Sequence, residues 1–298
     1  MRYNLFSFYL LSIKYIILSK VFGKELPFIG GIVINERCNL NCRHCSVANR
    51  DIPDLTFEEV KIGLRRLYAI GLRYLYIEGG EPFLWRDNNK SLKDVINLAR
   101  EIGFRFIVLY TNGTFPITTD ADTIFISLDG LKHTHNIIRG NTYDRIISNI
   151  IKSPHKKLLI NYTINKKNEK EIEQFCYEIS KIEKIKGIFF YFYTPSHGID
   201  DLFLGFDKRK NIIKRILNLK KTGYKILNSK AALMGLYNDS WKRPNKLSYL
   251  YANKKLYQCC RAIGNSEICK HCGYLGLTEI YYIAKLNPNA IYSAFKYL

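Results

Sequence analysis

Three closely spaced cysteines near the start of the chain have the residue type and spacing of a metal-binding loop. Cys38, Cys42 and Cys45 form a C-x3-C-x2-C pattern. Thiolates are soft ligands that select Fe–S clusters, zinc or Cu(I) over harder metals. Three thiolates on a short loop can hold three irons of a [4Fe–4S] cluster and leave the fourth iron open to a small molecule. A closed zinc site needs a fourth ligand, which His44 could supply, so zinc stays as the alternative for this loop.

Five further segments follow the cysteines, and with them the chain resembles the radical S-adenosylmethionine (radical SAM) superfamily. In chain order they are 76–82 (YIEGGEP), 110–114 (YTNGT), 126–130 (ISLDG), 135–140 (HNIIRG) and 163–168 (TINKKN). Their order and separations match the family's over roughly residues 29–230. One cysteine motif is a hint, whereas five more elements in order make the resemblance specific.

The resemblance implies a [4Fe–4S] cluster on Cys38, Cys42 and Cys45, the residues on which catalysis depends, with S-adenosylmethionine on the open iron. One electron from a donor such as ferredoxin or flavodoxin would cleave the sulfonium C–S bond. The resulting 5′-deoxyadenosyl radical would abstract hydrogen from a substrate. The cofactors carry this chemistry, and the protein positions them.

The resemblance also implies contacts with S-adenosylmethionine. The backbone at Gly79, Gly80 and Glu81 is expected to accept hydrogen bonds from the methionine amino group. Arg139 is expected to meet the methionine carboxylate, and His44 stands where the family usually has an aromatic residue that stacks on adenine. The other expected contacts, with the ribose or methionine portion, come from Asn112, Ser127, Asp129 and Asn165.

Several of these assignments have plain structural alternatives. The two glycines could form a simple bulge, and Asn112-Gly113 alone would be an ordinary turn signal. Asp129 could instead hold Arg139 in a structural ion pair.

A second cysteine group lies near the C-terminal end, and its spacing is also typical of a metal site. It consists of Cys259, Cys260, Cys269 and Cys272. Its position resembles the cysteine-containing C-terminal extensions (twitch or SPASM type) of many radical SAM enzymes, although the gap between Cys260 and Cys269 is shorter than usual there. A second Fe–S cluster, zinc and no metal all remain as alternatives for this group.

Apolar runs rich in β-branched and aromatic residues alternate with amphipathic stretches between the two cysteine groups. The predicted strands are 30–34, 74–77, 106–110, 123–128, 158–164 and 187–193, and the predicted helices are 56–70, 91–102, 143–152, 169–181 and 207–222. Alternation of this kind predicts βαβ units and a parallel sheet. The fold class is therefore α/β, a partial (β/α)6 TIM-like barrel. The motifs follow the predicted strands, so they converge on the carboxyl edge where such barrels carry their sites.

The chain is strongly basic and begins with an apolar stretch. Its formal net charge of +20 favours polyanions such as nucleic acid or anionic lipid, with a solvated helix face as the plain alternative for the basic stretch 208–230. Residues 1–25 are expected to form an apolar helix that is too short and too charged to span a membrane, and an interfacial position fits it better. Closing the bottom of the barrel is its alternative role. The expected location is the cytoplasm, at the inner face of the membrane as a peripheral protein, because seven of eight cysteines fall in metal-type groups and no cleavable signal is evident.

These observations predict a radical SAM enzyme with three parts: an N-terminal helix (1–25), a partial barrel (26–230) and a small cysteine-bearing C-terminal domain (231–298). The substrate is unknown; the first hypothesis is a lipid-linked molecule, because the apolar N-terminal segment resembles that of lipid-modifying members. The alternatives are a peptide or protein maturase and, from a different class, a zinc-stabilised nucleic-acid-binding protein. Nucleic acid is the less favoured partner, because the basic stretch lacks interleaved aromatic residues for base stacking.

Overall fold

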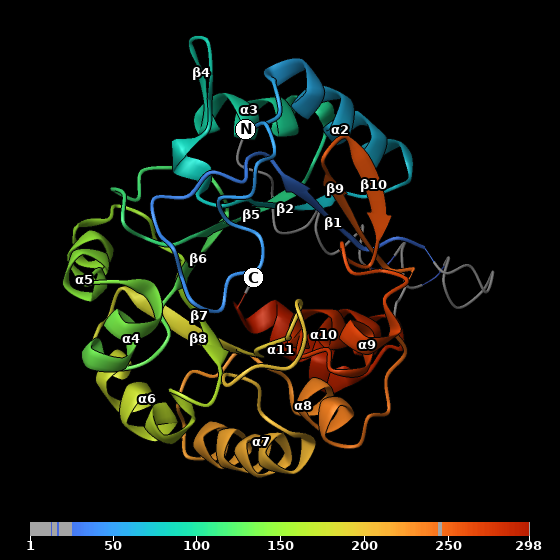
Figure 1. The fold of residues 1–298 in the computed structure, drawn as a ribbon. Coiled ribbons are helices and arrows are strands. Elements are labelled where there is room, and N and C mark those ends of the chain that lie inside the picture. Colours follow the sequence, from blue (N-terminus) through green and yellow to red (C-terminus); the bar gives the residue numbers. More distant parts are fainter. Residues whose placement is uncertain (1–12, 14–16, 18–25, 244–245, 298) are drawn as a thin grey trace.

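The computed structural model describes residues 13, 17, 26–243 and 246–297. The predicted N-terminal helix therefore lies almost wholly outside the described residues. Figure 1 shows a curved sheet with helices along its convex side. In the described part of the chain, no helix is long and apolar enough to cross a membrane.

All six predicted strands form, and they pair in parallel as expected for βαβ units. In sheet order they are β1 (Ile29–Val33), β2 (Tyr74–Glu78), β5 (Phe106–Thr111), β6 (Thr123–Ser127), β7 (Leu158–Ile164) and β8 (Ile185–Phe192). The register runs from Gly31 opposite Tyr76 to Asn161 opposite Phe189. The sheet does not close between β8 and β1, so the predicted partial TIM-like barrel is confirmed.

A helix or helix pair follows each of the six strands except β5, and these helices cover the outer face of the sheet (Figure 1). They are α2 (Phe57–Ala69), α3 (Leu92–Ile102), α4 (Lys132–Arg139), α5 (Tyr143–Lys152), α6 (Ile172–Ser180) and α7 (Phe206–Lys221). α2 begins at a capping box, in which Glu59 N donates to Thr56 Oγ1 (3.3 Å) and Thr56 N donates to Glu59 Oε2 (2.9 Å). The sequence did not predict α4, because the helix is short and most of its residues are polar.

Short elements complete this region. The 3-10 turn η1 (Pro82–Leu84) follows β2, and a second one, η2 (Glu169–Glu171), precedes α6. A small hairpin pairs β3 (Arg86–Asp87) with β4 (Lys90–Ser91).

The C-terminal segment extends the same sheet. β9 (Ser248–Ala252) pairs in parallel with β1, and β10 (Lys255–Gln258) pairs antiparallel with β9. The helices of this segment are α8 (Lys230–Tyr237), α9 (Ser266–Lys270), α10 (Leu275–Ala284) and α11 (Pro288–Tyr297). The division of the chain at residues 25 and 230 stays a proposal.

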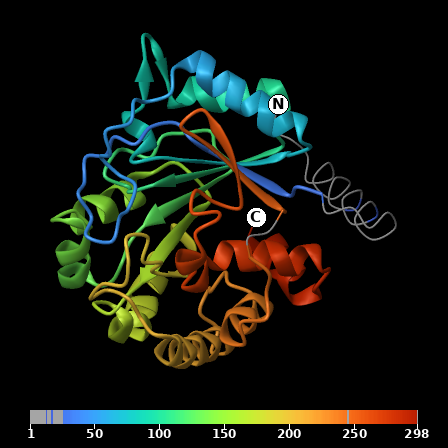
Figure 2. The same cartoon turned by 45° about the vertical axis from the view of Figure 1, so that its right-hand side comes forward.

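α10 lies between the two open edges of the barrel (Figures 1 and 2). On one side, Gly273, two residues before the helix, accepts a hydrogen bond from Phe192 N on β8 (3.0 Å). On the other side, Leu277 and Ile280 of α10 pack in a cluster with Phe28 and Ile29 at β1. The helix thus occupies the gap that the six-strand barrel leaves open.

Candidate active site

The first cysteine group lies on the loop between β1 and α2, at the carboxyl edge of the sheet (Figure 1). Asn49 shapes this loop: its Oδ1 accepts from Cys38 N (2.8 Å) and its Nδ2 donates to Leu40 O (2.9 Å). Cys45 N donates to Cys42 O (3.0 Å), which forms a tight turn between the last two cysteines. These bonds hold the three thiols on one short segment.

Side chains from other strand ends donate toward the sulfurs. Asn112, after β5, places its Nδ2 3.6 Å from Cys38 Sγ, and Arg139, at the end of α4, places Nη1 3.8 Å from Cys42 Sγ. Burial raises the pKa of Cys42 to about 11, and Arg139 opposes that rise. A bound metal deprotonates its thiol ligands, and these N–H donors would then stabilise the sulfur charge.

The donor set suits a cluster better than a single ion. Among the described residues, no three Cys, His, Asp or Glu side chains converge on a point that would hold one metal ion. A [4Fe–4S] cluster distributes its thiolate ligands over separate irons, whereas zinc requires all ligands around one centre. Cys38, Cys42 and Cys45 supply the donor type that such a cluster takes.

The two glycines after β2 are required by close packing against the exit of β1. A Cβ on Gly79 would lie 2.5 Å from Asn35 O, and one on Gly80 would lie 2.3 Å from Arg37 O. Gly80 N donates to Asn35 O and Glu81 N donates to Arg37 O, both at 2.9 Å. The carbonyls of Gly79 and Gly80 accept no hydrogen bond from any described residue, so they are available to a ligand.

Glu81 is fully buried, and its carboxylate joins the loop after β2 to the loop after β5. It accepts from Thr111 Oγ1 (2.8 Å), Asn112 N (2.7 Å) and Phe83 N (3.1 Å). Burial raises the pKa of Glu81 to about 7 against these hydrogen bonds. The side chain thus supports the site, and the backbone is engaged as well: Glu81 O accepts from Asn35 Nδ2 (2.9 Å) and from Leu84 N (3.0 Å).

Asn112 is also committed to the scaffold. Besides Cys38, its Nδ2 contacts Asn39 Oδ1 (2.9 Å), and its Oδ1 accepts from Thr114 N (2.9 Å) and Thr114 Oγ1 (2.7 Å). These bonds fix the β5 loop against the cysteine loop.

Asp129 and Arg139 form the structural ion pair that the sequence left as an alternative. Arg139 Nε donates to Asp129 Oδ2 (2.6 Å), and Thr163 N donates to Asp129 Oδ1 (2.6 Å). Burial alone would raise the pKa of Asp129, but Arg139, His44 and this N–H hold it below its ordinary value. The pair brings the ends of β6, β7 and α4 together beside Cys42.

His44 is the third member of this group and is neutral. Arg139 Nη2 lies 3.2 Å from His44 Nε2, and because a guanidinium only donates, that nitrogen accepts and the proton is on Nδ1. Burial and Arg139 lower the pKa of His44 to about 4. Its Nδ1 is buried without a hydrogen-bond partner among the described residues, which leaves one N–H for a ligand.

The two remaining predicted contacts differ in character. Asn165 is fully buried, and its Oδ1 accepts from Lys167 N (2.9 Å), so it forms the turn after β7. Ser127 ends β6 opposite Asn161, and its hydroxyl makes no hydrogen bond with a described residue. The structure thus brings all predicted residues of the first site to one edge of the sheet, and Ser127 is among those left free for a ligand.

Comparison with known proteins agrees with this geometry. The model of the radical SAM superfamily matches residues 32–179, which span β1 through α6 and contain the cysteine loop. The chain belongs to the radical SAM superfamily. Its curated relatives include an Fe-coproporphyrin III synthase of Methanosarcina barkeri, 31% identical over 53% of this chain and 42% of that protein. A pre-heme d1 synthase of Dinoroseobacter shibae is 28% identical over 47% of this chain and 37% of that protein.

Two further matches cover more of the chain. A probable GTP 3′,8-cyclase of Methanocaldococcus jannaschii is 25% identical over 86% of this chain and 83% of that protein. The solved structure of Streptococcus suis SuiB bound to precursor peptide SuiA has a TM-score of 0.64 at 15% identity, covering 93% of this chain and 70% of that one. The latter likeness shows that the two chains share a fold, including the region beyond residue 179. The chain spans less than half the length of the first two curated relatives.

The second cysteine group lies between β10 and α10, beside the radical SAM site. Arg209 of α7 anchors it: the buried guanidinium donates to the carbonyls of His271 (3.1 Å), Tyr193 (2.9 Å) and Leu204 (2.9 Å). Arg209 has no carboxylate within 4 Å among the described residues. The Cys272 thiol is the acidic group beside it.

Glu36 connects the two cysteine groups, and sequence analysis missed it. This buried carboxylate accepts from Arg50 on the first cysteine loop (2.5 Å) and from Arg261, next to Cys260, at 2.8 Å. Glu36 lies three residues after the end of β1, so its position near a strand end was the only available signal. Its partners, separated by up to 225 residues in sequence, gave none.

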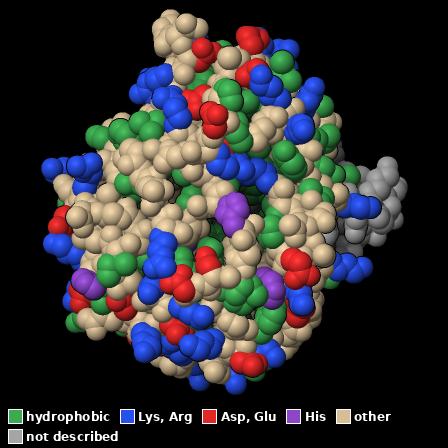
Figure 3. Space-filling model, in the orientation of Figure 1, with side chains coloured by type: hydrophobic (Ala, Val, Ile, Leu, Met, Phe, Trp, Pro, Cys, Tyr) green, Lys and Arg blue, Asp and Glu red, His purple; other side chains and the backbone are tan. Residues whose placement is uncertain are grey.

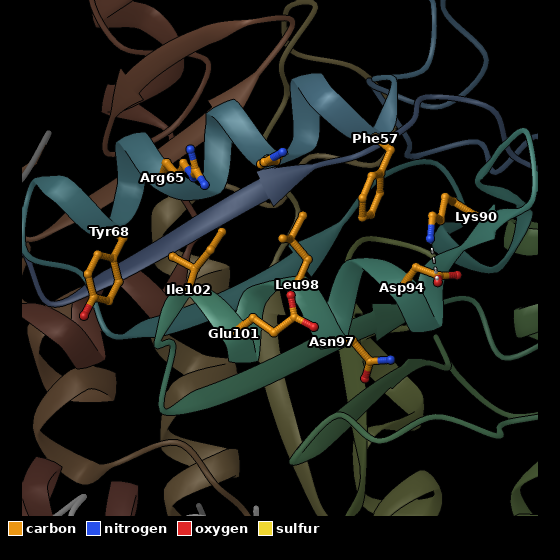
Figure 4. Close-up of a pocket in the computed structure, with 10 residues that line it drawn as sticks. Phe57, Arg65, Tyr68, Lys90, Asp94, Asn97, Leu98, Glu101 and Ile102 are labelled. Atoms are coloured by element: carbon orange, nitrogen blue, oxygen red, sulfur yellow. Dashed lines mark ion pairs between the residues drawn. The ribbon is translucent and has the colours of Figure 1, made fainter.

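A groove of about 670 Å³ lies elsewhere, between α2 and α3 on the outer surface (Figure 4). Its lining mixes apolar groups such as Tyr68 and Leu98 with charges of both signs, including the Lys90–Asp94 ion pair. It lies on the helix side of the sheet and contains none of the cysteine-loop residues, so it is not the active site.

Proposed function

We propose that this chain is a radical SAM enzyme that binds a [4Fe–4S] cluster through Cys38, Cys42 and Cys45. The observation that carries the proposal is that one strand edge carries three thiols on one loop, two N–H donors toward sulfur, and the Gly79 and Gly80 carbonyls, which accept no hydrogen bond from a described residue. Together, the bound cluster and S-adenosylmethionine would supply a 5′-deoxyadenosyl radical for hydrogen abstraction.

The chain's own residues would divide the remaining tasks. The Gly79 and Gly80 carbonyls would accept hydrogen bonds from the methionine amino group. The Nη groups of Arg139 lie beside Cys42, with the guanidinium held by Asp129, and would bind the methionine carboxylate. His44 offers its unpartnered Nδ1–H, and Ser127 its hydroxyl, to the nucleoside portion. Glu81, Asn112 and Asn165 act through the loops they fix.

We further propose that Cys259, Cys260, Cys269 and Cys272 hold a second Fe–S cluster. A buried guanidinium needs a nearby negative charge, and Arg209 has a cysteine thiol beside it in place of a carboxylate. Metal-bound thiolates would supply that charge.

The names of the relatives point to different products, so family membership selects no substrate. A lipid-linked substrate and a position at the inner membrane surface stay predictions from the N-terminal segment, and a peptide substrate stays the alternative. The electron donor is expected to be a ferredoxin or flavodoxin.

Anaerobic iron and sulfide analysis with EPR of the reduced protein tests the proposal. The protein is compared with a Cys38/Cys42/Cys45→Ala variant, with and without S-adenosylmethionine. Cys176→Ala is the matched control, because Cys176 is buried in α6 away from both cysteine groups.

We expect a [4Fe–4S] signal that S-adenosylmethionine perturbs, that the triple variant loses and that the control keeps. Iron remaining in the triple variant would support the second cluster. Zinc without iron, after anaerobic reconstitution has also failed, would refute the enzyme and favour the zinc-stabilised binding protein.

A further inference from the structure

The inner face of the curved sheet is incompletely filled. On β2, the outward residues Leu75 and Ile77 are fully buried, whereas the inward Tyr76 and Glu78 are only partly buried. On β7, Ile160 is fully buried and its inward neighbour Asn161 is not. Side chains alternate between the two faces of a strand, so the accessible set is the inner one. Figure 3 shows this side of the molecule hollowed near its centre.

Aromatic rings surround this inner space. Tyr110 stacks on Phe125 with ring centroids 5.0 Å apart, and its hydroxyl lies 3.3 Å from that of Tyr191. The ring contacts continue on both sides, from Tyr76 to Tyr110 (6.1 Å), Phe125 to Phe189 (6.2 Å), Phe189 to Tyr191 (4.8 Å) and Tyr191 to Tyr274 (5.6 Å). The wall therefore combines apolar rings with phenolic oxygens.

Glu78 carries a carboxylate into this space without a partner. Within the described part of the chain, it has no hydrogen bond to its side chain and no cation within 4 Å. The groups that face it are Tyr76, Tyr110, Tyr274, Cys260 and Arg261. Arg261 is the one cation in that set, and its guanidinium is bonded to Glu36 instead. Burial raises the pKa of Glu78.

An unpaired carboxylate among aromatic rings is a binding site for a cation. Buried charges in proteins are paired, and ring faces attract ammonium and guanidinium groups. The net charge of +20 repels cations at long range, so this acid would act locally, as a counter-ion at one position.

We propose that the inner space binds a substrate group that is an organic cation with N–H donors, and that Glu78 is its counter-ion. The proposal rests on the proposed function, since Glu78 directly precedes the Gly79–Gly80 carbonyls and the cation would therefore lie beside S-adenosylmethionine. Tyr110 and Tyr191 would offer ring faces and hydroxyl acceptors to the same group.

The test is a calorimetric titration of cationic probes into the anaerobically reconstituted protein, which already holds S-adenosylmethionine. It measures binding without turnover. The cationic probes are N-acetyl-arginine amide and N-acetyl-lysine amide, each with a neutral counterpart, N-acetyl-citrulline amide and N-acetyl-norleucine amide. Butylamine represents a free cation rather than a peptide side chain. The variants are Glu78→Gln and Tyr191→Phe, with Glu101→Gln as the control, because Glu101 is an exposed acid of α3.

We expect at least one cation to bind more tightly than its neutral counterpart. Glu78→Gln should weaken it by roughly tenfold or more, as for the loss of a charge-assisted hydrogen bond. Tyr191→Phe should weaken it less, and Glu101→Gln should leave it unchanged. If an acetylated amide binds more tightly than butylamine, the source of the cation is a peptide side chain. If butylamine binds more tightly, the source is a free amine.

Equal affinity for cations and neutral counterparts, no binding of any cation, or binding that Glu78→Gln leaves intact would overturn the inference. The EPR response to S-adenosylmethionine is scored separately. A failed substrate inference therefore leaves that response in place, whereas a failed enzyme proposal removes it.

Discussion

The substitution Asp129→Asn tests whether the ion pair beside Cys42 organises the site. The carboxylate is fully buried and accepts from Arg139 Nε and Thr163 N, each at 2.6 Å. Asparagine keeps the shape but leaves the Arg139 guanidinium buried without its counter-ion. Breaking a buried pair from one side costs about 3–5 kcal/mol.

The matched control is Asp144→Asn, which breaks a pair of similar length in solvent. Asp144 Oδ2 lies 2.6 Å from Lys132 Nζ, with its side chain 71% exposed. Exposed pairs contribute about 0–1 kcal/mol. Comparing the two variants therefore separates the effect of burial on stability from the effect of ion pairing itself.

The assay is urea unfolding under anaerobic conditions. Asp129→Asn should lower the free energy of unfolding several-fold more than Asp144→Asn does. Because the folded-state pKa of Asp129 lies below its ordinary value, this stabilisation is present above the unfolded pKa of about 3.9 and is lost as the pH falls through the folded pKa. Equal losses in the two variants at neutral pH would refute the argument.

Two further predictions concern buried carboxylates that join loops. Glu36→Gln should expose the segments around residues 36–50 and 259–262 together to limited proteolysis, because Glu36 bonds both Arg50 and Arg261. The control Glu58→Gln, which removes an exposed ion pair with Lys61, should expose neither segment. Cleavage of only one segment in Glu36→Gln would contradict the coupling. Glu81→Gln should remove a pH dependence of stability. The pKa of Glu81 is raised from 4.5 to about 7, so its favourable contribution is full below about pH 4.5 and is lost toward pH 7, on the order of 3 kcal/mol. If the stability of the unsubstituted protein and that of Glu81→Gln changed in parallel with pH, the pH dependence would not come from Glu81.

The first site could be predicted from sequence because its parts occupy strand ends. Cys38, Gly79, Asn112 and Asp129 each follow a strand of a parallel sheet, and parallel strands bring their carboxyl ends to one edge whatever the details of packing. Local pattern therefore sufficed for position. It did not suffice for role, since Asn112 could equally have met a ribose, and only its bonds to Cys38 and Asn39 show that it fixes the loops.

The inner space could not be predicted in the same way, because it depends on how the C-terminal segment packs. Tyr76 and Tyr110 would be ordinary core residues if the barrel were filled. The proposed site depends on Tyr274, just before α10, which meets Tyr191 across the open edge of the sheet. It depends also on Glu36, which holds Arg261, so that no cation of the described residues lies within 4 Å of Glu78. These contacts join residues far apart in sequence, for which no local spacing gives a signal. The same segment that carries the second cysteine group thus sets both the wall and the charge of the space where a substrate would meet the radical SAM site.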